Sequence, residues 1–477
     1  MSVSSPNSNT NKYSINKNED SLCKDSSVDS LPANTSKKAP NLENKGKASD
    51  TAIDHSLNVP EKFSFSNISV VSRNSIRDEM EKEWINLTSL QSKKCPYAQD
   101  IQSNTCLTET STQSKSKSDT LTEVKPSAPI TLENNSDYLF DLGISYFRGE
   151  NVNQDFYQAF NYFNKAANLG HATAKFNLGC MFEKGNGINQ DFIKAAECYL
   201  KAAEQGEAKA QCNLALLFEV GKGVNKDAEK AIFWYKKAAE QNNIPALCNL
   251  ALMFEGGQGI AKDEAIAASW YEKAATLGDA EAQFNLAKIY ETGKVFDRNI
   301  SKAIIWYQKS ARQGNDLASL RLATIYTLGL GVKIDLSQAA IFLTLAADNG
   351  NAKAQFALCV AYDNGHGVDK SPTQAALWCK KAATQGNATA LLYLGLMYEH
   401  GNGVVKNNAT AVKYFTQSAL TGFKDAQLAL GDAYAKGKLV KKNLSEAAKW
   451  YDKAAQQGDA EAIQKLAKLK NQVTSKA

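Results

Sequence analysis

A repeat of fixed length dominates the second part of the chain and limits what it can fold into. Units of 36 residues follow one another without a change of spacing, and each closes on a residue that tolerates a left-handed backbone. Such a period marks a supersecondary unit that cannot bury its apolar surface alone, so the units must stack. The closing residues are Gly170, Gly206, Asn242, Gly278, Gly314, Gly350, Gly386, Gly422 and Gly458.

Each unit carries two apolar patterns with helical spacing. In the first pattern an alanine, a leucine, a small residue and an aromatic residue recur at i, i+4, i+5 and i+8, as in Ala174, Leu178, Gly179 and Phe182. The second pattern starts after a capping residue such as Asp191 and carries an alanine with a bulky residue three positions later. We therefore predict two helices per unit with the bulky residues in the core. These are Trp234, Trp270, Trp306, Trp378 and Trp450 in five units.

A Gly-x-Gly motif lies between the two patterns, as at Gly185 and Gly187. Taken alone, it resembles a loop that holds a phosphate. A phosphate loop, however, follows a strand and leads into a helix N-terminus, whereas here a helical pattern precedes the glycines. We interpret the motif as a helix C-cap and chain reversal, not as a nucleotide site.

The fold class predicted for the repeats is all-α. We expect a solenoid over 135–470, with a capping helix at 459–470 and a disordered tail at 471–477. Residues 1–134 are rich in Ser, Asn, Lys and Thr, which predicts a disordered region. A candidate short amphipathic helix near 75–90 would fold back on the repeats or dock on a partner. The predicted units are 135–170, 171–206, 207–242, 243–278, 279–314, 315–350, 351–386, 387–422 and 423–458.

Charge and composition argue against several classes of protein. Residues 1–134 carry 16 Lys and Arg against 17 Asp and Glu, and the remainder carries 39 against 33. This mild surplus includes no basic tract, so we expect no nucleic-acid partner. No run of 18 apolar residues and no secretory signal occur, so we expect no direct membrane insertion and a cytoplasmic location. The nine cysteines are irregularly spaced, and the six that lie in the repeats are expected as small apolar core residues in a reducing compartment.

The sequence offers no catalytic constellation. His55, His171, His366 and His400 have no cysteine or serine partner at a recognisable spacing, and no metal motif or P-loop is present. We therefore predict no enzyme, no catalytic residues, no cofactor and no metal site.

One position of the first helix changes its chemistry along the chain. Four units carry asparagine there, and the following units carry Arg321, Ala357 and Tyr393. We expect this position, with Lys288 on the same face, to line a continuous inner surface of the solenoid. The amides would either bond the adjacent backbone or clamp an extended peptide. The candidate partner-binding residues are Asn177, Asn213, Asn249, Asn285, Lys288, Arg321 and Tyr393.

A glutamate also recurs near the end of the first helix, where the helix dipole disfavours it. Because paired catalytic carboxylates should occur once and not in several layers, we predict that these residues make inter-unit hydrogen bonds. The five are Glu183, Glu219, Glu255, Glu291 and Glu399.

The unit at 280–314, AEAQFNLAKIYETGKVFDRNISKAIIWYQKSARQG, resembles a Sel1-like repeat, a relative of the tetratricopeptide repeat. The 36-residue period, the Gly-x-Gly turn and the WYxKAA ending separate it from the 34-residue tetratricopeptide pattern. The resemblance covers 135–470. It implies a right-handed α-solenoid and an adaptor that holds protein complexes together.

The layout of a Ser/Asn-rich head before the repeats is similar to fungal cytosolic regulators of chitin synthase, which implies a role in cell-wall or septum formation. The partners implied are proteins, either an extended peptide segment or a membrane-enzyme complex, with recruitment to the division site or cell cortex. The alternative is an adaptor for a protein kinase or for cell-cycle or stress signalling. A ubiquitin-ligase-associated adaptor and a hydrolase are the weaker alternatives.

Overall fold

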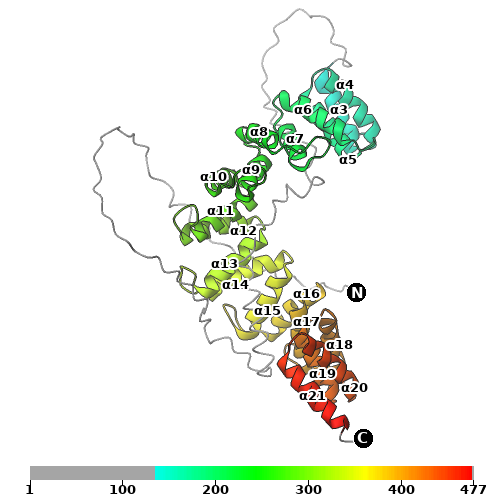
Figure 1. Cartoon of the computed structure of the whole chain (residues 1–477), viewed down its shortest axis with the longest axis vertical. Coiled ribbons are helices and arrows are strands. Elements are labelled where there is room, and N and C mark those ends of the chain that lie inside the picture. Colours follow the sequence, from blue (N-terminus) through cyan, green and yellow to red (C-terminus); the bar gives the residue numbers. More distant parts are fainter. Residues whose placement is uncertain (1–134, 475–477) are drawn as a thin grey trace, which may run out of the picture. The chain divides into compact units, whose positions relative to one another are not determined.

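The computed structural model describes residues 135–474, and this part of the chain is built from helices alone. The region 1–134, with the candidate helix at 75–90, and residues 475–477 lie outside the described residues. The helices alternate between a first and a second helix of each predicted unit, as the 36-residue period requires (Figure 1).

The first helices begin just after the predicted unit boundaries. The final helix runs to Thr474, so residues 471–474, which the sequence analysis placed in the tail, are helical. The first helices are α3 (Ser136–Arg148), α5 (Ala172–Lys184), α7 (Ala208–Val220), α9 (Ile244–Gly256), α11 (Ala280–Thr292), α13 (Asp316–Leu328), α15 (Ala352–Asn364), α17 (Ala388–His400), α19 (Lys424–Lys436) and α21 (Ala460–Thr474).

The second helices begin at the predicted capping residues. Asp191, for example, accepts hydrogen bonds from the backbone N–H groups of Ile193 and Lys194. These helices are α4 (Phe156–Asn168), α6 (Phe192–Glu204), α8 (Ala228–Glu240), α10 (Glu264–Thr276), α12 (Ile300–Arg312), α14 (Leu336–Asp348), α16 (Pro372–Thr384), α18 (Asn408–Leu420) and α20 (Leu444–Gln456).

The Gly-x-Gly motif is a turn, as its sequence context indicates. Gly185 adopts a left-handed φ of 74° and its N–H donates to Met181 O at 2.8 Å, which caps α5. The second glycine of the motif lets two units approach closely. A Cβ added to Gly259 would lie 2.3 Å from Cβ of Ala228, at the start of the preceding unit's α8. The motif therefore connects helices within a unit and seats that unit on the one before.

The core runs through the units as a series of clusters between neighbouring helices, and each helix packs on those before and after it. Within a unit, the small residue of the first helix lies against an aromatic ring of the second. A Cβ on Gly179 would come within 2.5 Å of the ring of Tyr199. This close approach explains why the position after the recurring leucine is small in each repeat.

Most of the predicted tryptophan row lies at the edge of the core, whereas Trp378 is buried. Trp234, Trp270 and Trp306 are half-buried and all pack on one cluster, whereas the tyrosine after each of them is almost fully buried. Lysines three residues later cover several of these indoles, with Nζ of Lys309 lying 4.1 Å from the ring of Trp306. The tryptophans of adjacent units therefore line up as predicted, but the tyrosines are the larger core residues.

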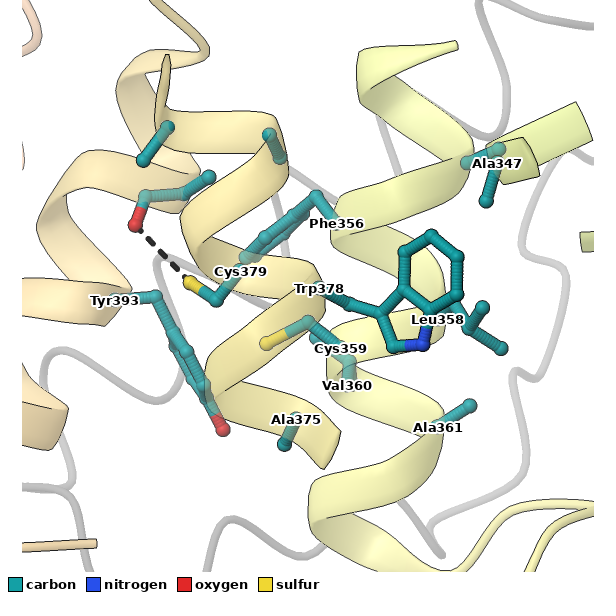
Figure 2. Packing of buried hydrophobic residues seen from close by; sticks show 14 of the residues in the cluster. Ala347, Phe356, Leu358, Cys359, Val360, Ala361, Ala375, Trp378, Cys379 and Tyr393 are labelled. Carbon is teal, nitrogen blue, oxygen red and sulfur yellow. Dashed lines mark hydrogen bonds between the residues drawn. The ribbon is translucent and has the colours of Figure 1, made fainter. Parts of the chain in front are cut away.

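The cysteines of the described region are free, and all but Cys198 are buried. Figure 2 shows Cys359 and Cys379 in the buried cluster of α15, α16 and α17, where Cys379 Sγ donates to Ala390 O at 3.2 Å. Burial raises the pKa of the half-buried Cys198 thiol to about 11. These side chains act as small core residues, as the sequence predicted.

Candidate functional site

The polar position of the first helix lies in the junctions between units. Asn177 and Asn249 are 3% exposed, Asn285 is 5% exposed and Tyr393 is 1% exposed. The expectation that this row lines an open inner surface is therefore wrong for these four residues. A first helix packs on its own second helix and also on the preceding unit, and the row faces that preceding unit.

The junction between α8 and α9 shows what the asparagine does there. Tyr235 Oη donates to Glu219 Oε2 at 2.8 Å, and Nδ2 of Asn249, from the next unit, donates to Tyr235 Oη at 3.1 Å. We call Glu219, Tyr235 and Asn249 the amide junction. Its asparagine bonds a side chain of the preceding unit, and its Oδ1 has no hydrogen-bond partner in the described residues, so Asn249 does not make the predicted backbone contact.

The recurring glutamates are bonded mainly inside their own unit. Tyr199 Oη donates to Glu183, Tyr271 Oη donates to Glu255 at 2.8 Å, and the same pairing occurs at Glu219. The prediction of inter-unit hydrogen bonds is thus wrong for Glu183 and Glu255, and correct for Glu291, which also accepts hydrogen bonds from Arg321 of the next unit. The missed signal was a tyrosine 16 residues after each of these glutamates, absent after Glu399, where Phe415 stands instead.

The junction between α11 and α13 departs from this pattern because arginine replaces asparagine. Tyr307 Oη donates to Glu291 Oε2 at 2.8 Å. Arg321 Nε donates to both carboxylate oxygens of Glu291 at 3.0 Å, and Nη2 also donates to this carboxylate. We call Glu291, Tyr307 and Arg321 the cavity junction.

The cavity junction encloses a volume of about 240 Å³. Phe284, Leu317 and Leu320 supply apolar lining, while Lys288 and Arg298 add positive charge. Arg298 Nε donates to the backbone oxygen of Glu291 at 3.1 Å, which holds the turn after α11 beside the cavity. The sequence analysis named Lys288 and Arg321, but not Arg298, which lies in the turn outside the helical pattern.

Electrostatics at this junction favour the charged pair. Burial acts to lower the pKa of Arg321, but its hydrogen bonds and ion pair with Glu291 outweigh this and raise the pKa. Burial and the adjacent Glu291 carboxylate raise the pKa of Tyr307 well above its usual value, so the phenol stays a hydrogen-bond donor. The cavity junction therefore contains a charged Arg321–Glu291 pair and a neutral Tyr307 phenol.

Two other junctions also contain a hydrogen bond from a tyrosine hydroxyl to a carboxylate, but with different residues around it. At the junction of α15 with α17, Cys379 replaces the core tyrosine of the second helix (Figure 2 shows Cys379 and Tyr393). Tyr393 from the next unit donates to Asp363 instead. At the end of the array, Asp432 accepts hydrogen bonds from Tyr451 Oη, Lys436 Nζ and Lys465 Nζ, each at 2.6 Å. A hydroxyl-to-carboxylate bond thus recurs while its neighbours change.

Among residues 135–474, no group of three or more His, Cys, Asp or Glu side chains is placed to hold a metal ion. None of the helices in the same range is long and apolar enough to cross a bilayer.

Comparison with solved structures finds the same architecture elsewhere. The chain is 32% identical to c5321, a protective antigen of uropathogenic Escherichia coli with an SLR fold, over 70% of this chain and 80% of that one, with a TM-score of 0.54. It is 28% identical to a Sel1 repeat protein from Oxalobacter formigenes, over 73% of this chain and 98% of that one, with a TM-score of 0.52. No curated protein matches the chain.

The Sel1 repeat family model matches the sequence nine times, over segments that follow the helical hairpins described above. These are residues 136–171, 172–207, 208–243, 244–279, 280–315, 317–351, 352–387, 388–422 and 424–459. Together they cover most of the chain, and the chain belongs to the Sel1 repeat family.

Proposed function

We propose that the chain is a non-catalytic scaffold that binds a segment of a partner protein at the cavity junction. Sel1 repeat proteins are typically protein-interaction scaffolds, which supports the general function. The observation that carries the location is the cavity of about 240 Å³ at the point where the repeating asparagine gives way to arginine. At two other positions of the row, Asn249 and Tyr393 are almost fully buried in their junctions.

The candidate partner-binding residues divide by exposure. Asn213, Lys288 and Arg321 are half-buried and reach the surface, so they remain candidates for direct contact. The four buried members of the row would act on a partner only through the packing of the junctions. Binding by any of the seven stays a prediction.

For the pathway, we propose regulation of chitin synthase, within cell-wall or septum formation. The support is the layout of the chain, a long Ser/Asn-rich region before the repeats. On this proposal, the chain is a cytosolic protein that its partners recruit to the division site or cell cortex. A protein kinase complex is the competing outcome of the experiment below.

Affinity capture with the full chain tests the scaffold function. The paired change Glu291→Gln with Arg321→Gln removes both charges of the cavity junction together, so neither is left buried and unpaired. Glu219→Gln in the amide junction is the matched control. Wild type and the control should retrieve the same protein assembly, and the paired variant should retrieve at least fivefold less. Equal recovery by all three would exclude the cavity junction as the docking site.

The same experiment addresses the pathway. Recovery of a chitin synthase, with the tagged chain forming a ring at the division site, would support the proposal. Recovery of a kinase with a diffuse or nuclear signal would replace it.

A further inference from the structure

Three consecutive second helices, α12, α14 and α16, present a line of exposed apolar side chains. Ile305, Ile341 and Leu377 occupy the same position of the repeat and are 51%, 52% and 49% exposed. The residues that follow them pack into the clusters that join successive units, so the three helices present this line side by side. Single exposed apolar residues are normal on a protein surface, but an aligned set marks an interaction surface. We call Ile305, Ile341 and Leu377 the apolar row.

Most other units have a polar residue at this position. Phe233 on α8 is also half-exposed, but Ser269 separates it from the apolar row. The apolar row is therefore a local departure from the repeat and not a requirement of its packing. The polar residues at this position are Asn161, Glu197, Ser269, Lys413 and Lys449.

Basic side chains surround the apolar row. The three helices contain five lysines and arginines but only one acidic residue, Asp348. All five basic side chains are exposed. An occupant of this surface should therefore combine an apolar face with surplus negative charge. The basic residues are Lys302, Lys309, Arg312, Lys380 and Lys381.

The chain itself carries a segment with this chemistry. Residues 75–90 lie outside the described residues, but their sequence has four apolar residues at helical spacing, and its acidic residues outnumber its basic ones by four to two. In a helix these apolar residues would span about 16 Å, against roughly 20 Å across the apolar row at ~10 Å per unit. The apolar residues are Ile76, Met80, Trp84 and Leu87, and the acidic ones are Asp78, Glu79, Glu81 and Glu83.

The connection between this segment and the repeats is long enough. Residues 91–135 link it to α3, and about 45 residues at ~3.4 Å each can span up to ~150 Å. The helix α12 belongs to the fourth unit after that of α3, at roughly 10 Å per unit. Because the tether keeps the segment near the repeats, its local concentration exceeds that of a free partner with the same chemistry.

We infer that residues 75–90 dock on the apolar row, as the amphipathic helix that their sequence predicts. Their apolar face packs on the apolar row, and their carboxylates lie beside the lysines of α12 and α16. This contact goes beyond the proposed scaffold function and does not use the cavity junction, whose α12 residue is the buried Tyr307.

Competition between the chain's own segment and a free peptide tests the inference. A fluorescent peptide of residues 75–90, with both ends blocked, is titrated with the full chain and with the full-chain double variant Met80→Ser, Trp84→Ser. In wild type the resident segment occupies the apolar row, so fluorescence anisotropy should show binding to the double variant at least tenfold tighter. Equal binding to the two chains, or binding to neither, would overturn the inference.

Further substitutions in the double variant assign the binding to the apolar row. Ile341→Glu should weaken peptide binding about tenfold or more, because it places a carboxylate opposite the acidic segment. Ile193→Glu adds the same charge at a 62% exposed residue of α6 and is the matched control, with no expected change. Equal losses in the two variants would refute the site. A peptide of the same composition in scrambled order that binds equally well would reduce the effect to general electrostatics and refute it too.

Two other occupants of the apolar row give different results. If a second copy of the chain covers it, sedimentation of wild type shows a dimer that Ile341→Glu dissociates. If a partner protein covers it, Ile341→Glu abolishes affinity capture while the free peptide binds wild type and the double variant equally. Either result would overturn docking of residues 75–90.

Discussion

The cavity junction and the amide junction occupy equivalent places in the repeat and differ in their side chains. Both have a glutamate that receives a tyrosine hydroxyl at 2.8 Å from the second helix of the same unit. The amide junction adds Asn249, which donates to the tyrosine, and the cavity junction adds Arg321, which donates to the glutamate. Arg321, together with Lys288 where the amide junction has Leu216, thus accompanies a charged cavity in place of the asparagine-to-tyrosine contact. The repeat fixes the helices, and this position is free to set the chemistry.

The largest expected difference between the two junctions follows removal of the glutamate. Glu291→Ala leaves Arg321 buried without its ion pair and should destabilise α11–α13 by about 3 kcal/mol or more. Glu219→Ala removes a hydrogen bond from a neutral tyrosine and should cost about 1–2 kcal/mol. Hydrogen exchange of peptides from each junction measures this, because long repeat arrays do not unfold in one step. Equal effects would show that the arginine adds no dependence on the carboxylate.

The next largest difference between the two junctions is expected when their turn glycines are replaced by alanine. Gly259 and Gly331 have left-handed φ angles of 75° and 74°, so alanine is strained at both by about 1–2 kcal/mol. A Cβ at Gly259 would also lie 2.3 Å from Cβ of Ala228, which cannot rotate away. At Gly331 the atom nearest to an added Cβ is Cγ1 of Ile300, at 2.8 Å, and this side-chain atom can rotate away. We expect Gly259→Ala to lower the local free energy of unfolding by about 3 kcal/mol, and Gly331→Ala to lower it by about 1 kcal/mol less. Hydrogen exchange at each junction measures both values.

The asparagines should show a smaller contrast within their own row. Asn249 donates to Tyr235, so Asn249→Ala should destabilise its junction by about 1 kcal/mol. Asn177 is buried with neither amide atom hydrogen-bonded in the described residues, so Asn177→Leu should be neutral or stabilising. A stabilising Asn249→Leu would contradict a structural role for the amide.

The smallest effects are expected from pH at two further junctions. Burial raises the pKa of Glu183, and the Tyr199 hydrogen bond only partly offsets this. Its folded form therefore favours the proton, and its contribution to stability is present at low pH and lost as pH rises above the usual value of 4.5. Burial also acts to raise the pKa of Asp432, but hydrogen bonds from Lys436 and Lys465 outweigh it and lower the pKa. Its contribution is present above 3.8 and lost as pH falls through the lowered value.

Two substitutions test these opposite signs. Glu183→Gln should become more stable relative to wild type as pH increases from about 4 to 8. Asp432→Asn should be less stable than wild type at pH 7 and similar to it at about pH 2–3. Hydrogen exchange corrected for the intrinsic pH dependence, read on α5–α6 and α19–α21, gives both, and the same sign at both sites would contradict the account.

Much of the fold could be predicted from the sequence because local signals repeat. The left-handed φ of 60° at Asn242, the cap at Asp191 and the Gly-x-Gly turn each follow from one or two residues and their spacing. The burial of Asn177 and Asn249 could not be predicted from the sequence, because periodicity identifies a polar face of a helix but not the neighbour that covers it. Whether Tyr235 or Trp234 is the deeper residue depends likewise on how α8 is rotated against α7.

The candidate site was predictable only in part. The change from Asn285 to Arg321 marked the position, and Lys288 followed from helical spacing. Arg298 and the cavity depend on how the turn after α11 folds back on that helix, which no pattern in the sequence specifies.

The most direct test of the central claim is a hydrogen-exchange footprint of the full chain bound to its captured partner. If the cavity junction docks the partner, residues 284–292 and 317–330 become protected more strongly than the equivalent residues of the amide junction. Protection confined to the second helices, with α11 and α13 unchanged, would contradict the account.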